Sequence, residues 1–265
     1  MFKDITLGQY YPADSVLHRM DPRFKIVLAL GFIVLAFLVD TVWGYVMVAA
    51  LLALAIGLSR VPLRTILRGL RPLVFILCFT FVLNLFLSRS GAVLWRWWIF
   101  SITEGGIRTA VRMAVRLTLL VAGTSLLTLT TSPLKLTDGL EALLRPLKAV
   151  KFPAHELAMM MTIALRFIPT LAEEANRIRM AQAARGADFD TGGLVKRAMS
   201  LVPLLVPLFI SAFRRAEDLA VAMEARCYHG GEGRTKLNVL HAGLRDYAAL
   251  LTLLGGLLAA TVGGL

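Results

Sequence analysis

The sequence contains little charge and little cysteine. Charged residues make up only 17% of its 265 residues, whereas hydrophobic residues make up 57% and the mean hydropathy is +0.71. A soluble domain carries about 25% charged residues, so this composition excludes an ordinary soluble protein and predicts a protein of the lipid bilayer. The two cysteines, Cys78 and Cys227, lie in very different settings, and no Cys/His spacing indicates a metal. We therefore expect neither a disulfide nor a metal site.

The sequence also lacks the motifs that carry nucleotide and hydrolytic chemistry. It has no GxxxxGK[ST] phosphate loop, no HExxH, no GxSxG and no Asp-rich pair for magnesium-pyrophosphate. We expect no catalytic residue and no cofactor, so any work done by this chain needs an external source. The net charge of +12 is typical of basic cytoplasmic loops in membrane proteins, and we expect no nucleic-acid partner.

Five apolar runs are predicted to cross the membrane: 24–39, 42–58, 73–87, 105–129 and 247–265. Asp21 and Pro22 predict a helix start before the first run, and we expect the polar residues ahead of them not to act as a cleavable signal peptide. Basic residues before the first run and after the second predict a cytoplasmic amino terminus, and the carboxyl terminus then lies outside.

The fourth run carries three arginines on one stripe: Arg108, Arg112 and Arg116. Intramembrane arginines are either a buried contact for a partner or substrate path, or part of the packing within the bundle, and the sequence favours neither. The loop before this run is rich in aromatic residues, which predicts a belt at the membrane interface and allows a short hairpin. These residues are Trp95, Trp97, Trp98 and Phe100.

Residues 132–245 differ in character, because prolines punctuate amphipathic helices there. Two long helices are predicted, 155–185 with a kink at Pro169, and 193–226 with kinks at Pro203 and Pro207. The expected fold is all-α: a polytopic membrane protein with about five transmembrane helices. Residues 1–131 form helices one to four, 132–245 a cytoplasmic or interfacial helical domain, and 246–265 the final transmembrane helix.

Within the first long helix, Glu173 and Glu174 are adjacent carboxylates, and Arg177 follows at helical spacing. Exposed pairs of this kind are common and individually weak. We interpret the three residues as a solvated helix face.

A short pattern occurs twice, at the end of each long helix. The first copy ends in Ala184-Arg185-Gly186 and the second in Ala225-Arg226-Cys227, each with a further Ala three residues before the first. The alanines share one helix face and allow close approach, while the arginine can bind carbonyls or a carboxylate. Gly186 suits a left-handed helix end, whereas Cys227 does not, so we expect Gly230-Gly231 to stop the second helix later. Two docking points for similar partners explain the duplication better than two arginines that merely complement helix dipoles.

Several stretches resemble the transmembrane subunit of energy-coupling factor transporters, usually called EcfT, including its cobalt, nickel and biotin versions. They are Asp21-Pro22-Arg23-Phe24-Lys25, Thr131-Ser132-Pro133 with Leu140 to Leu147, Leu165 to Pro169, and the two arginine motifs. The resemblance covers nearly the whole chain, and it departs from the family at Cys227, where the second motif has Gly.

The resemblance implies a non-catalytic scaffold in a bacterial or archaeal plasma membrane, with residues 132–245 as a cytoplasmic coupling-helix domain. It joins two ABC-type ATPase subunits, which bind the ATP, to a substrate-binding membrane protein, the S-component. By the same likeness, Arg185 and Arg226 each enter a groove on one ATPase subunit, and the motion releases a vitamin or metal ion inward. By the same likeness, the apolar stretch 201–213 is a candidate face for the S-component. From the residues alone, methionines 159–161 and Met180 are either ordinary core packing, which is the commoner case, or a soft surface for exchanging partners.

Two other functions are compatible with the residues alone. One is a membrane-embedded enzyme that acts on a lipid or prenyl phosphate through the stripe of Arg108, Arg112 and Arg116. It lacks the paired carboxylates that most such metal-assisted chemistry needs. The other is a classical ABC permease, which differs in having a single coupling helix per chain.

Overall fold

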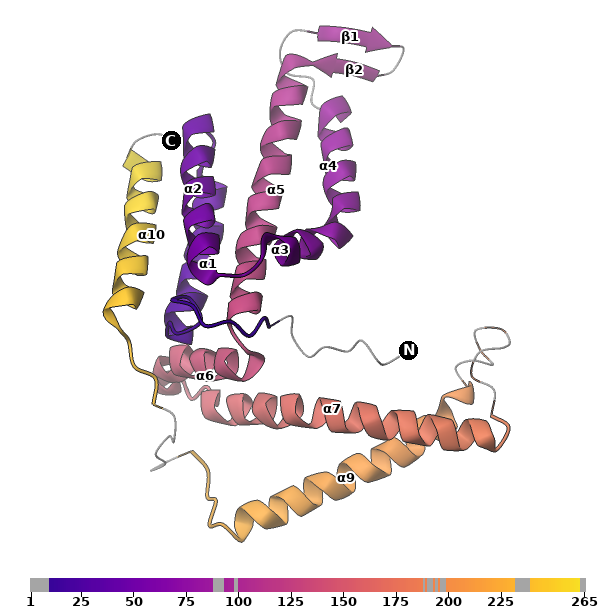
Figure 1. Cartoon of the computed structure of the whole chain (residues 1–265). Helices are drawn as coiled ribbons and strands as arrows, with labels where there is room; N and C mark the ends of the chain where they lie inside the picture. Colours follow the sequence, from indigo (N-terminus) through magenta and orange to yellow (C-terminus); the bar gives the residue numbers. More distant parts are fainter. Residues whose placement is uncertain are drawn as a thin grey trace. The chain divides into compact units, whose positions relative to one another are not determined.

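The computed structural model describes residues 10–87, 93–97, 100–187, 189, 193, 195, 199–231 and 239–262 (Figure 1). Contacts divide the chain into two units. The membrane unit comprises Gly8–Ala142 with Val239–Leu265, and the two-helix unit comprises Leu143–Asn238 together with Met1–Leu7.

The membrane unit consists almost entirely of helices. In chain order its elements are α1 (Pro22–Leu38), α2 (Val42–Ser59), α3 (Leu63–Leu70), η1 (Arg71–Leu73), α4 (Val74–Leu87), β1 (Val93–Trp97), β2 (Phe100–Thr103), α5 (Glu104–Thr130), α6 (Pro133–Leu144, which ends just past the unit boundary) and α10 (Leu244–Val262). Strands β1 and β2 form a short antiparallel hairpin, as the sequence allowed. Trp98 of the aromatic belt lies outside the described residues.

Four helical segments among the described residues are long and apolar enough to cross a membrane. They are Val42–Ser59, Leu63–Phe86, Glu104–Thr130 and Leu244–Val262. Helix α1 has 17 residues and is at the lower limit for a spanning helix. The predicted class, an all-α polytopic membrane protein with about five transmembrane helices, is confirmed. The third span differs in detail, because α4 is short and is extended by η1 and α3.

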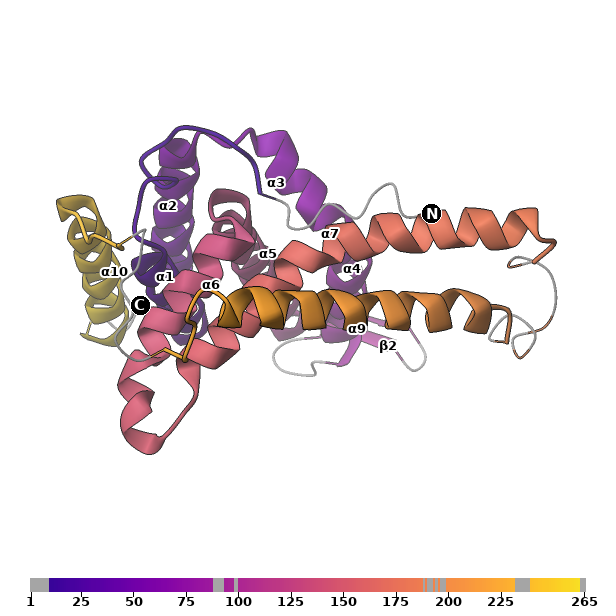
Figure 2. The same cartoon turned by 90° about the horizontal axis from the view of Figure 1, so that it is seen from below.

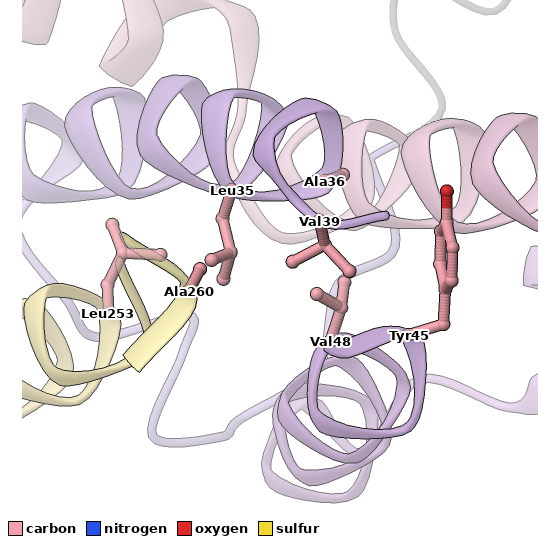
Figure 3. Close-up of a cluster of buried hydrophobic side chains, with 7 residues drawn as sticks. All are labelled: Leu35, Ala36, Val39, Tyr45, Val48, Leu253 and Ala260. Atoms are coloured by element: carbon pink, nitrogen blue, oxygen red, sulfur yellow. The ribbon is translucent and has the colours of Figure 1, made fainter. Parts of the chain in front are cut away.

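Helix α5 is the central helix of the membrane unit, since α1, α2, α3 and α4 all pack against it. One cluster of buried side chains joins α1, α2 and α10. Figure 3 shows Leu35 of α1 beside Ala260 of α10, and Val39, just after α1, facing Val48 of α2. A second cluster joins α2 and α5 through Leu52, Leu126 and their neighbours. Gly123 lets α5 approach α1 closely, because a Cβ there would overlap the ring of Phe32.

Arg116 has bonding partners within the membrane unit. Its guanidinium donates to the Val39 carbonyl at 2.7 Å and to Asp40 Oδ1 at 2.8 Å, and it lies 5.8 Å from the ring centres of Phe37 and of Tyr45. It therefore caps the end of α1, which favours packing within the bundle for this arginine. Arg112 is half-buried and Arg108 is exposed.

The two-helix unit contains η2 (Arg145–Val150), α7 (Ala154–Ala184) and α9 (Val202–Glu224). Helix α7 matches the predicted bounds and continues through Pro169. Helix α9 begins later than predicted, with Pro203 in its first turn, where proline is favoured, so Pro203 marks a start and not a kink. The predicted start near Gly193 falls among residues that the structure describes only in part.

Helices α7 and α9 lie side by side and run in opposite directions, as Figures 1 and 2 both show. The carboxyl end of α7 is therefore at one end of the pair, and the carboxyl end of α9 is at the other.

Candidate functional site

The two arginine motifs end their helices with the same hydrogen bonds. At the end of α7, Gly186 N donates to Ala183 O and Ala187 N donates to Gln182 O, both at 3.0 Å. At the end of α9, the equivalent amides, those of Cys227 and Tyr228, donate to Glu224 O at 2.8 Å and to Met223 O at 3.0 Å. In each set, the bond that spans five residues, from Ala187 to Gln182 and from Tyr228 to Met223, is the one that defines a Schellman helix end.

Cys227 takes the backbone conformation that glycine takes in the first copy. Its φ is 56° and that of Gly186 is 85°, both in the left-handed region. The expectation that Cys227 would not close the helix, and that Gly230-Gly231 would do so later, is wrong. Left-handed geometry costs a residue with a Cβ about 1–2 kcal/mol, and the two amide bonds of the helix end offset this cost.

All six residues of the motifs are exposed: Ala184, Arg185, Gly186, Ala225, Arg226 and Cys227. Neither guanidinium makes a hydrogen bond or an ion pair with another residue in the described part of the chain. The alanines one turn earlier, Ala181 and Ala222, are exposed as well. Each helix end thus offers a free cation beside a surface of small side chains that another backbone can approach closely.

The structure also brings together three residues whose contact the sequence did not predict. Glu174 of α7 accepts a bond from Arg215 of α9 at 2.8 Å, and its other carboxylate oxygen accepts a short bond from the Ser211 hydroxyl. These bonds, the Ser211 hydroxyl first and then the Arg215 guanidinium, hold the pKa of Glu174 below its ordinary value. The interpretation of Glu173, Glu174 and Arg177 as a solvated face is therefore wrong for Glu174. The available signal was the spacing of Ser211 and Arg215, which places both on one face of α9.

The Asp-Pro-Arg-x-Lys stretch has a structural role in the membrane unit. Asp21 accepts a bond from Arg23 N at 2.9 Å and caps α1, as predicted. Its own amide donates at 3.1 Å to Asp246 Oδ1 at the start of α10. Lys25 Nζ donates to Thr130 O and Thr131 Oγ1, both at 3.1 Å, at the end of α5. These buried polar groups, here called the clamp, fasten together the ends of α1, α5 and α10.

A polytopic helical protein with two exposed helix-end arginines that have no partner among the described residues belongs to the class of membrane subunits that work as part of a larger assembly. Comparison with known proteins gives the family. The chain belongs to the family described as "Cobalt transport protein" (CbiQ), whose model matches residues 13–237.

Several proteins named "Energy-coupling factor transporter transmembrane protein EcfT" are similar over almost the whole chain. The relative from Thermosediminibacter oceani is 55% identical over 249 residues, covering 94% of each chain. The one from Ruminiclostridium cellulolyticum is 52% identical over 240 residues, covering 91% of this chain and 90% of the relative. That from Bacillus subtilis is 44% identical over 254 residues, covering 96% of both.

Family membership confirms the resemblance and determines the general function. The chain is a membrane-embedded, non-catalytic transmembrane component of an energy-coupling factor transporter, and other components complete that complex. The interpretation as an enzyme acting on a lipid or prenyl phosphate is thereby set aside, as is that of a classical ABC permease.

Proposed function

We propose that this chain transmits the motion of two ABC-type ATPase subunits to a substrate-binding S-component, and that Arg185 and Arg226 each dock into one ATPase. The observation that carries the proposal is the equivalence of the two helix ends. They share hydrogen bonds and left-handed closure, and they lie at opposite ends of an antiparallel pair. Two similar subunits can therefore each bind one end without competing for it. ATP is bound by those subunits, and this chain holds no cofactor.

The S-component is proposed to bind an apolar face of α9. Phe209 and Phe213 stack with ring centres 6.3 Å apart and are 61% and 70% exposed, and Ile210 between them is 50% exposed. A contiguous exposed apolar patch of this kind marks a site of contact with a protein or a membrane, and the proposal assigns it to the S-component. Met160 and Met161 of α7 are also exposed, which favours the interpretation of the methionines as a partner surface over that of core packing.

The orientation follows from charge and remains part of the proposal. Arginines after α2 and along α3 favour a cytoplasmic position for that edge of the membrane unit, and for the amino terminus. With residues 132–245 as the cytoplasmic coupling domain and 246–265 as the last span, the carboxyl terminus lies outside the plasma membrane. The substrate, a vitamin or a metal ion, is selected by the S-component.

Charge reversal at the helix ends tests this function. Arg185→Glu or Arg226→Glu places a carboxylate where an arginine is proposed to dock, which costs on the order of 3–5 kcal/mol for a broken buried pair. We expect each variant to copurify with less ATPase and to lose ATP-driven uptake. Arg64→Glu, an exposed arginine of α3, is the control. Normal assembly and uptake in both single variants would remove the role of the arginines, and assembly must be measured because misfolding also abolishes uptake.

A further inference from the structure

The contact between α7 and α9 lies at equivalent positions in the two copies of the repeat. Glu174 precedes Arg185 by eleven residues, and Arg215 precedes Arg226 by eleven. At a rise of 1.5 Å per residue, each arginine is about 16 Å along its helix from the Glu174–Arg215 ion pair. The pair therefore stands midway between the two ends of an approximately two-fold symmetric arrangement.

From this symmetry we infer that Glu174, Ser211 and Arg215 form a pivot, a positioning contact that sets the angle between the two arms carrying Arg185 and Arg226. The inference rests on the proposed function and deepens it. The arms are residues 174–185 of α7 and residues 215–226 of α9.

Apolar packing alone does little to fix the angle between these helices. Helix α9 buries no residue, and α7 buries only Ala154, Ala158 and Ala175. The carboxylate of Glu174 is instead held by two donors on successive turns of α9, Ser211 and Arg215. Two bonds to one carboxylate define a direction as well as a distance, since each oxygen is committed to a different donor.

Because the arms are long, a small change of angle at the pivot moves the arginines at their ends by a large distance. A rotation of about 5° at the pivot displaces each end by about 1.4 Å over an arm of about 16 Å. Such a displacement is enough to misalign hydrogen bonds to a guanidinium, whose useful range of donor to acceptor distances spans only about 0.5 Å. The pivot therefore determines whether both arginines engage at once.

The symmetry allows an exchange of charges. Thr170 precedes Glu174 by four residues, as Ser211 precedes Arg215, so each charged residue of the pair has a hydroxyl one turn before it. Thr170 and Arg215 line the same recess of about 390 Å³ between α7 and α9. A chain with Arg at position 174 and Glu at position 215 could therefore form the same ion pair, with Thr170 in the place of Ser211.

The experiment uses the full chain, alone and in the assembled transporter. Spin labels at Met180→Cys and at the native Cys227, with Cys78→Ala, report the distance between the arms in the isolated chain, and ATP hydrolysis is measured on the unlabelled transporter because Cys227 adjoins a proposed docking residue. Glu174→Arg and Arg215→Glu are each expected to broaden that distance distribution. Each is also expected to raise the ATP hydrolysed per substrate transported by about fivefold, the upper end for a partly exposed ion pair. The double variant Glu174→Arg/Arg215→Glu is expected to restore both values, and Glu173→Arg, an exposed neighbour, to change neither.

A contact that only stabilises the fold would lower the melting temperature of the single variants and leave the distance distribution and the ATP ratio unchanged, and this result overturns the pivot. So does a double variant that recovers neither value. If charge reversal prevents folding, Glu174→Gln and Arg215→Gln remove the charge without reversing it and are read in the same way. The label distances need no ATPase, so failure of the pivot is distinguishable from failure of the proposed function, which appears as normal assembly of the Arg185→Glu and Arg226→Glu variants.

Discussion

The membrane unit and the two-helix unit use polar residues in opposite ways. In the membrane unit, polar groups such as Asp21, Lys25 and Asp246 are buried and bonded across helix ends. In the two-helix unit, α9 buries nothing, and the free cations are on the surface. A buried polar group cannot be removed without leaving its partners unsatisfied, whereas an exposed one can. We therefore expect the membrane unit to hold its shape alone and, on the proposed function, the two-helix unit to be stabilised by its partners.

Removing a buried polar group of the clamp is expected to cause the largest loss of stability of all the variants considered for the two units. Asp246→Ala leaves the amides of Asp21 and Gly243 without their acceptor and removes a buried negative charge near Lys25. We expect a loss of about 3–5 kcal/mol in stability, measured by thermal unfolding of the chain in detergent. Asp246→Asn keeps one acceptor oxygen and should lose less. Equal losses in the two variants would contradict the role of the carboxylate.

A matched pair of leucines compares the packing of the units directly. Leu35 of α1 is fully buried, so Leu35→Ala is expected to cost about 2–5 kcal/mol through lost contacts and a cavity. Leu205 of α9 is 44% exposed, and Leu205→Ala should change the stability of the chain alone by no more than about 0.5 kcal/mol. Both are measured by thermal unfolding. A large effect at Leu205 would mean that α9 is already packed in the isolated chain.

Opposite substitutions at the two helix ends are expected to change local stability by a smaller amount and in opposite directions. Cys227→Gly removes the strain of a Cβ in the left-handed region and should stabilise the end of α9 by about 1 kcal/mol. Gly186→Ala introduces the same strain at α7 and should destabilise that end by a similar amount. Amide hydrogen exchange at residues 187 and 228 measures both. Changes of the same sign would show that the two ends are not equivalent.

The smallest effect concerns pH at the pivot. The pKa of Glu174 is lowered in the folded chain, so its contribution is present above the unfolded value and is lost as the pH falls through the folded pKa. The group is partly exposed, and we expect less than about 1 kcal/mol. On acidification from neutral pH, the distance distribution between arm labels should broaden in the acidic range. Glu174→Gln should remove this pH dependence. If the distance distribution of the Glu174→Gln variant still changes with pH, another titratable group causes the change.

The sequence predicted those structural features that depend on neighbouring residues, such as where helices begin and end. The start of α1 followed from Asp21 and Pro22, and the bounds of α7 from its apolar period, because caps and periodicity act within a few residues. Contacts between distant segments were not predictable in this way. The bond from Asp21 to Asp246 joins residues 225 positions apart, and the pairing of Glu174 with Arg215 depends on how α7 and α9 pack.

Cys227 shows a second kind of limit. A cysteine carries no intrinsic preference for a positive φ, so its identity indicated a looser helix end. The amides of residues 227 and 228 nevertheless find the same acceptors as their counterparts in the first copy. Equivalence of the two motifs was thus better predicted by the repeated Ala-x-x-Ala-Arg pattern than by the residue that departs from it.

The thiol of Cys227 is exposed immediately after Arg226. The chain thus carries an exposed thiol next to one proposed docking point and none next to the other, where Gly186 stands. In the Cys78→Ala chain, a fluorophore attached there would report occupancy of a single end, so the order in which the two proposed motor subunits arrive could be followed in real time on an otherwise unaltered α9.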